Sequence, residues 1–554
     1  MKNPFRLRYP SSRAKRWVDG AVIYQIYPRS FQDSNDDGIG DLPGITSRLD
    51  YLKGLGVNGI WISPFYPSPM ADFGYDVADY CDVDPLFGTL EDFKILLEQA
   101  HQRNIKVIID IVPNHSSDEH EWFIQSKQSR TNKYSDWYIW HDPAGFSADG
   151  TPKVPNNWLG MFSGKSAWEW VPQRKQFYLH TFHTRQPDLN WQNPEVREAM
   201  KEVLRYWLRL GVDGFRVDAV PYLAKDPEFH DNPRSEHYNP KHDPPYYAFK
   251  HTNSSYWPKM YEYLNEMSGV LKEKEFAQHL RFMVTEGYVE RDAVISNYLR
   301  YYQSMDPAVA APFNFEGVSR SFSARDWRAF LHDFHETLDG FNPLAAASYA
   351  FGNHDQSRLV SRYGDVRARS VAVMQLTLPG MIFVYQGEEL GMHDVAIPPA
   401  LIQDPAANGN DGRDPERTPM QWSDEPYAGF SNTTPWLPVA HDYRKENVNS
   451  LAKDPKSFLS LYRRLLELRN NSGALRHGKL TVHEEASSHI LAFTRRSGRE
   501  SYTTVVNFDD APTPYVLGHR GRLVVSSIEV TPEKSPARAV FTLKPHEAIV
   551  IKDL

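Results

Sequence analysis

Short apolar runs rich in β-branched residues alternate with amphipathic segments along most of this 554-residue chain. Continuous apolar strands separated by helices are typical of a parallel sheet that is covered on both faces. We expect eight such strands, the number that closes a β/α barrel, at 22–28, 59–65, 106–112, 214–220, 282–285, 310–315, 347–352 and 381–385. The clearest helical patterns are 45–55, 90–103 with Thr89 as N-cap, 194–210 and 458–469.

Two stretches depart from this alternation. Residues 113–181 are rich in Trp, Ser, Asn and Pro and show no helical period, as expected of an inserted loop domain after the third strand. Beyond the last helix, strand candidates follow one another without helices between them, at 490–494, 503–507, 523–526, 539–543 and 548–552. The sequence therefore predicts an α/β fold: a (β/α)8 TIM barrel from 1–112 and 182–475, an inserted domain at 113–181, and a C-terminal antiparallel β-sandwich at 476–554.

Composition narrows the class of protein. The 62 basic and 70 acidic residues give a net charge of −8 without long runs of either sign, which disfavours a nucleic-acid partner. No apolar stretch reaches the ~20 residues of a membrane helix, and no signal peptide is expected. The single cysteine, Cys81, forms no intrachain disulfide and suits a reducing compartment, so we expect a cytoplasmic protein. Aromatic residues reach 13%, which suits a sugar-stacking site, although most rings are expected in the core.

Polar residues interrupt the apolar strands at their carboxyl ends, where a β/α barrel carries its active site. They occur in Asp110-Ile-Val-Pro-Asn-His115, in Arg216-Val-Asp218, in Thr-Glu286-Gly and in Asn-His354-Asp355. Ion pairs on the barrel rim are the structural alternative. Carboxylates close together repel one another, however, and a pair of them is the requirement of glycoside hydrolysis. The pattern therefore indicates a glycosidase.

These four segments resemble, in order and spacing, the conserved regions of the α-amylase superfamily, glycoside hydrolase family 13. The further segment Gln186-Pro-Asp-Leu-Asn190 is similar to the signature of its oligo-1,6-glucosidase/α-glucosidase group. The resemblance implies that Asp218 is the nucleophile, Glu286 the general acid/base and Asp355 the stabiliser of the transition state. Arg216, two residues from Asp218 on the same strand face, is expected to keep that carboxylate ionised.

The same resemblance implies the residues that hold the substrate. His115 and His354 match a pair that hydrogen-bonds the sugar in the first subsite. In Gly-Tyr75-Asp76, the tyrosine matches a stacking ring and the acid matches a residue that grips the far hydroxyls of the glucose. The arginine that pairs with this acid is expected to be Arg417, with Arg413 as the alternative. Such a clamp closes the pocket behind one glucose and makes the enzyme exo-acting.

An acidic loop after the first strand spaces oxygen ligands at alternate positions, in Asp33-Ser-Asn35-Asp-Asp37-Gly-Ile39-Gly-Asp41. This is the EF-hand order as far as its ninth position, but Gly44 stands where the bidentate glutamate belongs. The family resemblance implies a structural Ca²⁺ or Mg²⁺ held by Asp33, Asn35, Asp37, the carbonyl of Ile39, and Asp41. A turn-rich loop without metal is the alternative.

The resulting expectation is a retaining, exo-acting α-glucosidase that takes small α-glucosides and uses no organic cofactor. In the family group that the chain resembles, a small residue after the nucleophile goes with α-1,4 linkages and valine with α-1,6. Here that residue is Ala219, so the resemblance favours short α-1,4-linked substrates such as maltose and implies transglucosylation. Asp218-Ala-Val-Pro221 also looks like trehalose synthases, so an isomerase or sucrose-using transferase is the first alternative. A non-catalytic transporter relative is the second, although the chain keeps all three acids.

Overall fold

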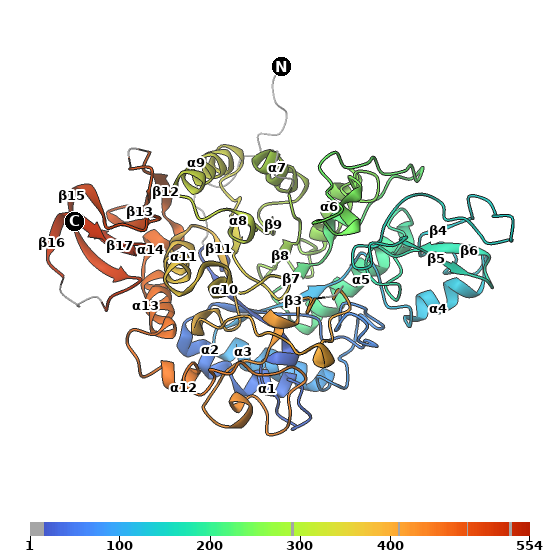
Figure 1. Ribbon diagram of the computed structural model, residues 1–554, viewed down its shortest axis with the longest axis horizontal. Helices are drawn as coiled ribbons and strands as arrows, with labels where there is room; N and C mark the ends of the chain where they lie inside the picture. Colours follow the sequence, from blue (N-terminus) through green and yellow to red (C-terminus); the bar gives the residue numbers. More distant parts are fainter. Residues whose placement is uncertain (1–15, 290–292, 408–409, 485, 531–534) are drawn as a thin grey trace, which may run out of the picture.

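Eight parallel strands form the central sheet of the computed structural model, which describes residues 16–289, 293–407, 410–484, 486–530 and 535–554 (Figure 1). Their order around the sheet is β10-β11-β1-β2-β3-β7-β8-β9. A parallel bridge between Asn314 and Tyr349 joins the last strand to the first and closes the barrel. The eight predicted barrel strands are confirmed, as β1 Val22–Ile26, β2 Gly59–Ile62, β3 Lys106–Ile111, β7 Gly214–Val217, β8 Phe282–Thr285, β9 Ala310–Pro312, β10 Ser348–Ala350 and β11 Met381–Tyr385.

Helices with one apolar face cover the barrel. In α3 (Leu90–Gln102), Thr89 and Asp92 form a reciprocal capping box at the N-terminus. In α5 (Pro194–Leu210), Asn193 caps the first turn and Gly211 ends the helix in the left-handed conformation. The remaining α-helices of the barrel region are α6 Met260–Val270, α7 Val294–Ser304, α8 Glu316–Ser319, α9 Ala324–Phe341, α10 Leu359–Tyr363, α11 Asp365–Thr377, α12 Val448–Leu451, α13 Phe458–Asn471 and α14 Gly473–His477.

The helix predicted at 45–55 is two helices, α1 (Leu42–Ser47) and α2 (Leu49–Leu55). The break lies at Arg48, whose backbone leaves the helical conformation. Its guanidinium Nε bonds Gln32 Oε1 at 2.7 Å and lies 4.2 Å over the ring of Trp422. These tertiary contacts, which no local pattern contains, position the residue where the chain bends.

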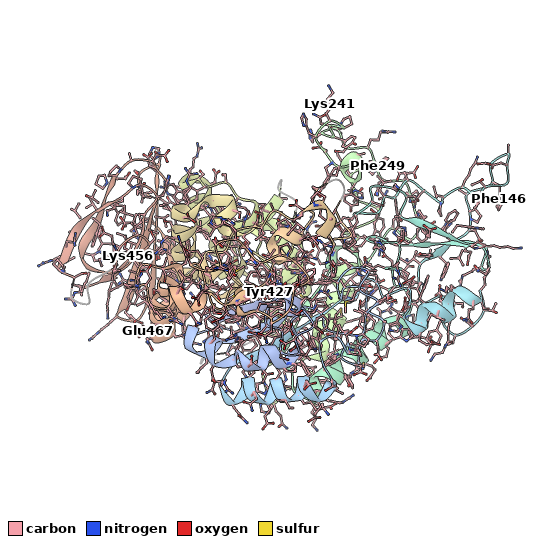
Figure 2. The ribbon with its side chains drawn as sticks, turned by 60° about the horizontal axis from the view of Figure 1, so that its bottom comes forward. Phe146, Lys241, Phe249, Tyr427, Lys456 and Glu467 are labelled. Atoms are coloured by element: carbon pink, nitrogen blue, oxygen red, sulfur yellow. The ribbon has the colours of Figure 1, made fainter. Side chains whose placement is uncertain are left out.

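The segment after β3 contains more regular structure than the sequence predicted. It holds α4 (Glu121–Gln128) and a three-stranded antiparallel sheet of β4 (Trp140–His141), β5 (Trp168–Val171) and β6 (Gln176–Leu179). Large side chains pack into a small core of their own there, including Trp158, Trp168 and Phe177. This segment extends to one side of the barrel in Figure 1, and Phe146 marks its exposed tip in Figure 2.

Six antiparallel strands follow the last helix and lie on the opposite side of the barrel (Figure 1). They are β12 Lys479–Val482, β13 Ile490–Ser497, β14 Glu500–Asn507, β15 Thr513–Ser526, β16 Ala537–Leu543 and β17 Ala548–Asp553. Hydrogen bonds link all six strands into one sheet. Five of the strands were predicted from the sequence, and β12 was not. One face contacts α9 and α11, and the other carries its own apolar cluster.

Long connections at the carboxyl ends of the strands complete the fold and carry short 3-10 helices. These are η1 Pro28–Ser30, η2 Val220–Tyr222, η3 Pro245–Ala248, η5 Glu388–Leu390, η6 Pro399–Leu401, η7 Asp414–Arg417 and η8 Pro426–Gly429. Among the helices in the described ranges, none is long and apolar enough to cross a membrane.

Candidate active site

Arg216 is the centre of the charged cluster at the carboxyl ends of the strands. Strand register places it directly opposite Asp110 on β3, and its Nη1 lies 2.9 Å from Asp110 Oδ1. The same Nη1 lies 2.6 Å from Asp218 Oδ1, and Nη2 lies 2.8 Å from Glu286 Oε2. One buried guanidinium therefore serves three carboxyl groups from three adjacent strands.

Backbone hydrogen bonds continue beyond the ends of these strands and hold the two predicted catalytic acids. The amide of Asp218 donates to Ile111 O at 2.8 Å, and the amide of Glu286 donates to Val217 O at 2.8 Å. Ala219 adopts a left-handed conformation with φ of 49°, and its amide donates to Glu286 Oε2 at 3.0 Å. The backbone at Ala219 thus binds the second acid directly.

The protonation of this cluster is shared. Burial raises the pKa of Asp218, Arg216 lowers it, and the neighbouring Glu286 and Asp110 raise it again. Burial likewise raises the pKa of Asp110 to about 6, against the opposing charge of Arg216. Three ionised carboxylates around one guanidinium leave excess negative charge in a buried site, so the cluster keeps a proton to a higher pH than an exposed carboxyl group does. Arg216 therefore lowers the pKa of Asp218 as expected, but burial and the two neighbouring acids outweigh it.

Asp355, after β10, lies in a more positive environment. Its Oδ1 accepts from Arg417 Nη2 at 2.7 Å and from Arg413 Nη1 at 3.2 Å. Burial opposes its ionisation, but the positive groups around it outweigh burial and hold the pKa of Asp355 below its usual range. Asp355 therefore stays ionised at a lower pH than Asp218 and Asp110, whose pKa values are raised.

The two histidines are buried and line the same cavity. His354 lies between the rings of Tyr27 and Tyr75, with centroid separations of 5.4 and 5.3 Å. Burial lowers the pKa of His354 to about 3 and that of His115 to about 4. Both imidazoles are therefore neutral near pH 7 and can hydrogen-bond a sugar without adding charge.

Tyr75 and Asp76 lie in different surroundings. Tyr75 lines the cavity and donates its hydroxyl to Asp110 Oδ2 at 3.0 Å. Asp76 is fully buried and accepts from Ser68 and from the amides of Ala71 and Asp72 at 2.7–2.9 Å. Among the described residues, no ion pair joins Asp76 to an arginine, so its carboxylate organises its own loop.

The acid–arginine clamp is formed by a different pair. Asp72 Oδ1 lies 2.8 Å from Arg413 Nη2, and both side chains line the cavity. Arg417, the favoured partner in the sequence prediction, is buried behind Asp355 and donates Nε to His354 O at 2.8 Å. The structure therefore corrects both members of the predicted clamp: Asp72 replaces Asp76, and the alternative Arg413 replaces Arg417. Asp72 and Asp76 lie four residues apart in one loop, and nothing in the sequence around them indicated which of the two faces the cavity.

A cavity of about 540 Å³ collects most of these residues. Its lining includes the three predicted catalytic acids, both histidines and the Asp72–Arg413 pair, together with rings that the sequence analysis did not single out. These additional lining residues come mainly from the connections after β7 and β8 and include Tyr222, Tyr246, Tyr247, Tyr256 and Tyr288. The run Pro245-Tyr-Tyr in a long connection was their only visible signal.

The predicted metal loop is ordered by hydrogen bonds to its own backbone. Asp33 accepts from the amides of Asn35, Asp36 and Gly38, and Asp37 Oδ1 accepts from the amide of Ile39. Asp41 accepts from Ser34 and caps α1 through the amide of Gly44. Within the described ranges, no group of three or more His, Cys, Asp or Glu side chains is gathered as metal ligands. The loop therefore has the hydrogen bonding of an Asx turn series.

Comparison with known proteins decides the family. The model of the alpha-amylase catalytic domain matches residues 25–478. The chain belongs to the alpha-amylase family. Among relatives of this family, the probable alpha-glucosidase of Rhizobium meliloti (strain 1021) is 42% identical over 510 residues, covering 89% of this chain and 90% of its own. The predicted alpha-glucosidase group is thereby confirmed.

Solved structures of the alpha-amylase family match over nearly the whole chain. An alpha-glucosyl transfer enzyme, XgtA, superposes with a TM-score of 0.86 at 38% identity, covering 98% of this chain and 100% of that one. A mutant of the trehalulose synthase MutB superposes with a TM-score of 0.80 at 34% identity, covering 97% and 100%. The proteins that match this chain therefore include a glucosidase, a glucosyl transfer enzyme and a trehalulose synthase by name.

Proposed function

We propose that this glycoside hydrolase is an exo-acting retaining α-glucosidase that releases the terminal glucose of short α-1,4-linked substrates. The observation that carries the proposal is the shared cluster, in which Arg216 contacts Asp218 and Glu286 at 2.6 and 2.8 Å in the lining of one cavity. Adjacent carboxyl groups that share a proton supply both a nucleophile and an acid. Names of relatives support glucosidase activity, including the probable alpha-glucosidase described above.

The proposed reaction has two displacements. Asp218 attacks the anomeric carbon while Glu286 donates its proton to the leaving oxygen, so the glycosidic bond breaks as the glucosyl ester forms. Glu286 then takes a proton from water, whose oxygen attacks the same carbon and releases Asp218. Arg216 and the Ala219 amide hold Glu286, while the ionised Asp355 favours positive charge developing on the sugar.

Exo action follows from the clamp. The ion pair between Asp72 and Arg413 joins two connections in the lining of the cavity, and each partner has a second contact, Gln186 for Asp72 and Asp404 for Arg413. A polysaccharide chain would have to break this pair to extend past it. The cavity therefore suits a terminal glucose, and Ala219 in its lining favours the α-1,4 linkage.

Transfer to a second sugar or an alcohol is the alternative outcome at the same site, and the names of the structural neighbours favour it. Product analysis on maltose, isomaltose, sucrose and trehalose separates the cases. Glucose alone as the product from maltose supports the hydrolase, trehalose from maltose supports the isomerase, and longer or mixed glucosides support the transferase.

The test of the mechanism is the Asp218→Asn variant assayed on p-nitrophenyl α-glucoside. Loss of the nucleophile is expected to lower kcat at least 10³-fold, roughly the effect of removing a group that forms a covalent intermediate. Proton NMR of the first product should show α-glucose, as retention requires. Unchanged turnover in the variant, or β-glucose as the first product, would overturn the proposal.

We also propose that the loop from Asp33 to Asp41 holds a structural Ca²⁺ or Mg²⁺, because its oxygen ligands are of the kind that both ions take. Metal analysis of the purified protein and thermal unfolding with and without chelator test this. Binding of one ion per chain and a lower unfolding midpoint in chelator are expected. Protein without bound metal, whose midpoint is unaffected by added Ca²⁺ or Mg²⁺, would contradict it.

A further inference from the structure

Lys225 is a buried lysine that the proposed mechanism does not use. It follows the nucleophile by seven positions, on the connection after η2, and its Nζ lies 2.6 Å from Asp188 Oδ2. The same Nζ donates to Asn114 Oδ1 at 3.0 Å. Lys225 therefore joins the exit of β3, the Gln-Pro-Asp-Leu-Asn segment and the connection after the nucleophile at one point.

These contacts determine which way the Asn114 amide points. An ammonium group only donates, so the atom of Asn114 that faces Lys225 is the oxygen. An ionised carboxylate only accepts, and Asp188 Oδ1 lies 3.3 Å from Asn114 Nδ2, which confirms the same orientation. The amide NH₂ is thereby directed to its third neighbour, His115 Nδ1, at 3.1 Å.

This orientation selects the tautomer of His115. An amide NH₂ cannot accept, so His115 Nδ1 must lack a hydrogen and Nε2 must carry it. The carbonyl oxygen of Tyr75, which only accepts, lies 3.1 Å from His115 Nε2 and agrees. One contact opposes this assignment: Gln186 Nε2 lies 3.1 Å from His115 Nε2, with its own amide oriented by Asp72 and by the amide of His183. Two contacts against one favour the Nε2–H form.

The geometry points to Lys225 as a positioning residue that, through Asn114, holds His115 as the neutral Nε2–H tautomer and so presents a hydrogen-bond donor to the sugar. The inference rests on the proposed function for the identity of the ligand, but the tautomer itself is a property of the free protein. His115 lies in the cavity lining, so its Nε2–H can exchange the Tyr75 carbonyl for a substrate hydroxyl oxygen. The charged groups that act on the pKa of this imidazole are Asp188 and Asp72, which raise it, and Lys225, which lowers it.

The experiment is ¹⁵N NMR of the full chain labelled at histidine, without substrate, with the His115→Gln variant used to assign the resonance. Wild type is expected to show His115 with an unprotonated Nδ1 and a protonated Nε2. In Lys225→Met the Asn114 amide keeps only its 3.3 Å contact with Asp188 Oδ1, so its orientation is held less firmly and the Nδ1–H tautomer should appear beside the Nε2–H form. In Asn114→Asp a carboxylate that only accepts faces Nδ1, so the hydrogen should move to Nδ1.

Kinetics on p-nitrophenyl α-glucoside give the second measurement. Both variants lose the oriented donor and should lower kcat/KM about tenfold, the value of one hydrogen bond of roughly 1.4 kcal/mol. Lys259→Met is the matched control, because that lysine lies at the surface and pairs with Glu262 at 2.6 Å. It should alter neither the His115 resonances nor the kinetics.

Three results would overturn the inference. The first is wild-type His115 with its hydrogen on Nδ1. The second is Lys225→Met with a single Nε2–H tautomer and unchanged kcat/KM. The third is Asn114→Asp with the wild-type tautomer. Because Lys225→Met leaves Asp188 without its cation, Asn114→Asp and the wild-type spectrum keep the inference testable if that variant does not fold. A protein without glucosidase activity but with the expected tautomers would refute the proposed function and still support the inferred effect of Lys225 and Asn114 on His115.

Discussion

Glu388 is a buried carboxyl group of the barrel that takes no part in the proposed reaction. It lies in η5, directly after β11, and is buried. Burial raises the pKa of Glu388 to about 8 from its usual 4.5, even though Arg362 and Arg358 act in the opposite direction. In the unfolded chain the same carboxyl ionises at its usual value, so folding and protonation of this group are coupled.

Stability is therefore expected to depend on pH through Glu388. Because the pKa of Glu388 is higher in the folded than in the unfolded protein, its protonation stabilises the fold. This stabilisation is fully present below pH 4.5 and is lost as the pH rises to about 8. The loss is about 1.4 kcal/mol per pH unit within this window. Glu388→Gln removes it, so the unfolding free energy of the variant minus that of wild type should increase from pH 5 to pH 8 in denaturant titrations.

The control for this prediction is Glu467→Gln, at an exposed glutamate of α13 that Figure 2 labels at the surface. Its difference from wild type should be the same at both pH values. A difference for Glu388→Gln that is also constant between pH 5 and pH 8 would show that this carboxyl is not held protonated by folding.

At the scale of single elements, helix ends depend on backbone conformation more than on side-chain contacts. Gly211 ends α5 with φ of 110°, a conformation that costs other residues roughly 1 kcal/mol or more. Gly340 is exposed in the last turn of α9, has helical backbone, and a methyl group added there would meet no atom within 4 Å. The same Gly→Ala change therefore has opposite consequences at the two positions.

We predict that Gly211→Ala lowers the thermal midpoint and that Gly340→Ala raises it slightly. The first change forces a β-carbon into a left-handed residue, at a cost of about 1 kcal/mol or more. The second gains up to about 1 kcal/mol, because alanine favours the helix and restricts the unfolded chain. Differential scanning calorimetry of the two variants measures both signs, and a stabilising Gly211→Ala would contradict the argument.

The elements themselves were largely readable from the sequence. Barrel strands such as β8 and β11 have the predicted bounds because an apolar run buried on both faces has sharp limits. The inserted segment was not readable. Its strands β4 to β6 have two to four residues each and pack through tryptophans spread over the segment, so no periodicity marks them.

At the scale of the whole molecule, the buried Arg495 connects the C-terminal sheet to the barrel and forms no ion pair with any carboxylate in the described part of the chain. Arg495 on β13 donates Nη1 to Thr377 O at the end of α11 at 2.8 Å, and Nη2 to Gly478 O at 3.1 Å. Burial lowers the pKa of Arg495 to about 9, which shows the cost of placing this cation between carbonyl groups. Arg495 thus joins β13 of the C-terminal sheet to α11 of the barrel.

Arg495→Met is predicted to weaken this junction. It leaves the carbonyls of Thr377 and Gly478 buried without a donor, at a cost of about 1–3 kcal/mol each. The thermal midpoint should fall by several degrees, and limited proteolysis should release the C-terminal sheet earlier. Arg496→Met, the next residue on the same strand and exposed, is the matched control and should change neither measurement. Equal effects of the two variants would show that the loss of a positive charge, and not the loss of the Arg495 contacts, lowers the stability.

The sequence by itself determined the barrel, the order of its strands along the chain, and the positions of Asp218, Glu286 and Asp355 at strand ends. It could do so because strand patterning and position along a strand are local properties of the chain. The same local information placed His115 and His354 near the site, and the family resemblance added Tyr75. Their roles in catalysis and binding stay predictions until the variants described above are measured.

Only the tertiary structure decided which neighbouring side chains meet. Asp72, not Asp76, reaches Arg413, because the loop turns the second acid inward to its own amides. Lys225 reaches Asn114 across 111 positions of sequence, and Arg216 on β7 contacts Glu286 at the end of the neighbouring strand β8. Such contacts join segments that are distant in the chain, and their existence depends on how the barrel closes and where its connections pack. Pairing at the site is therefore a property of the folded molecule.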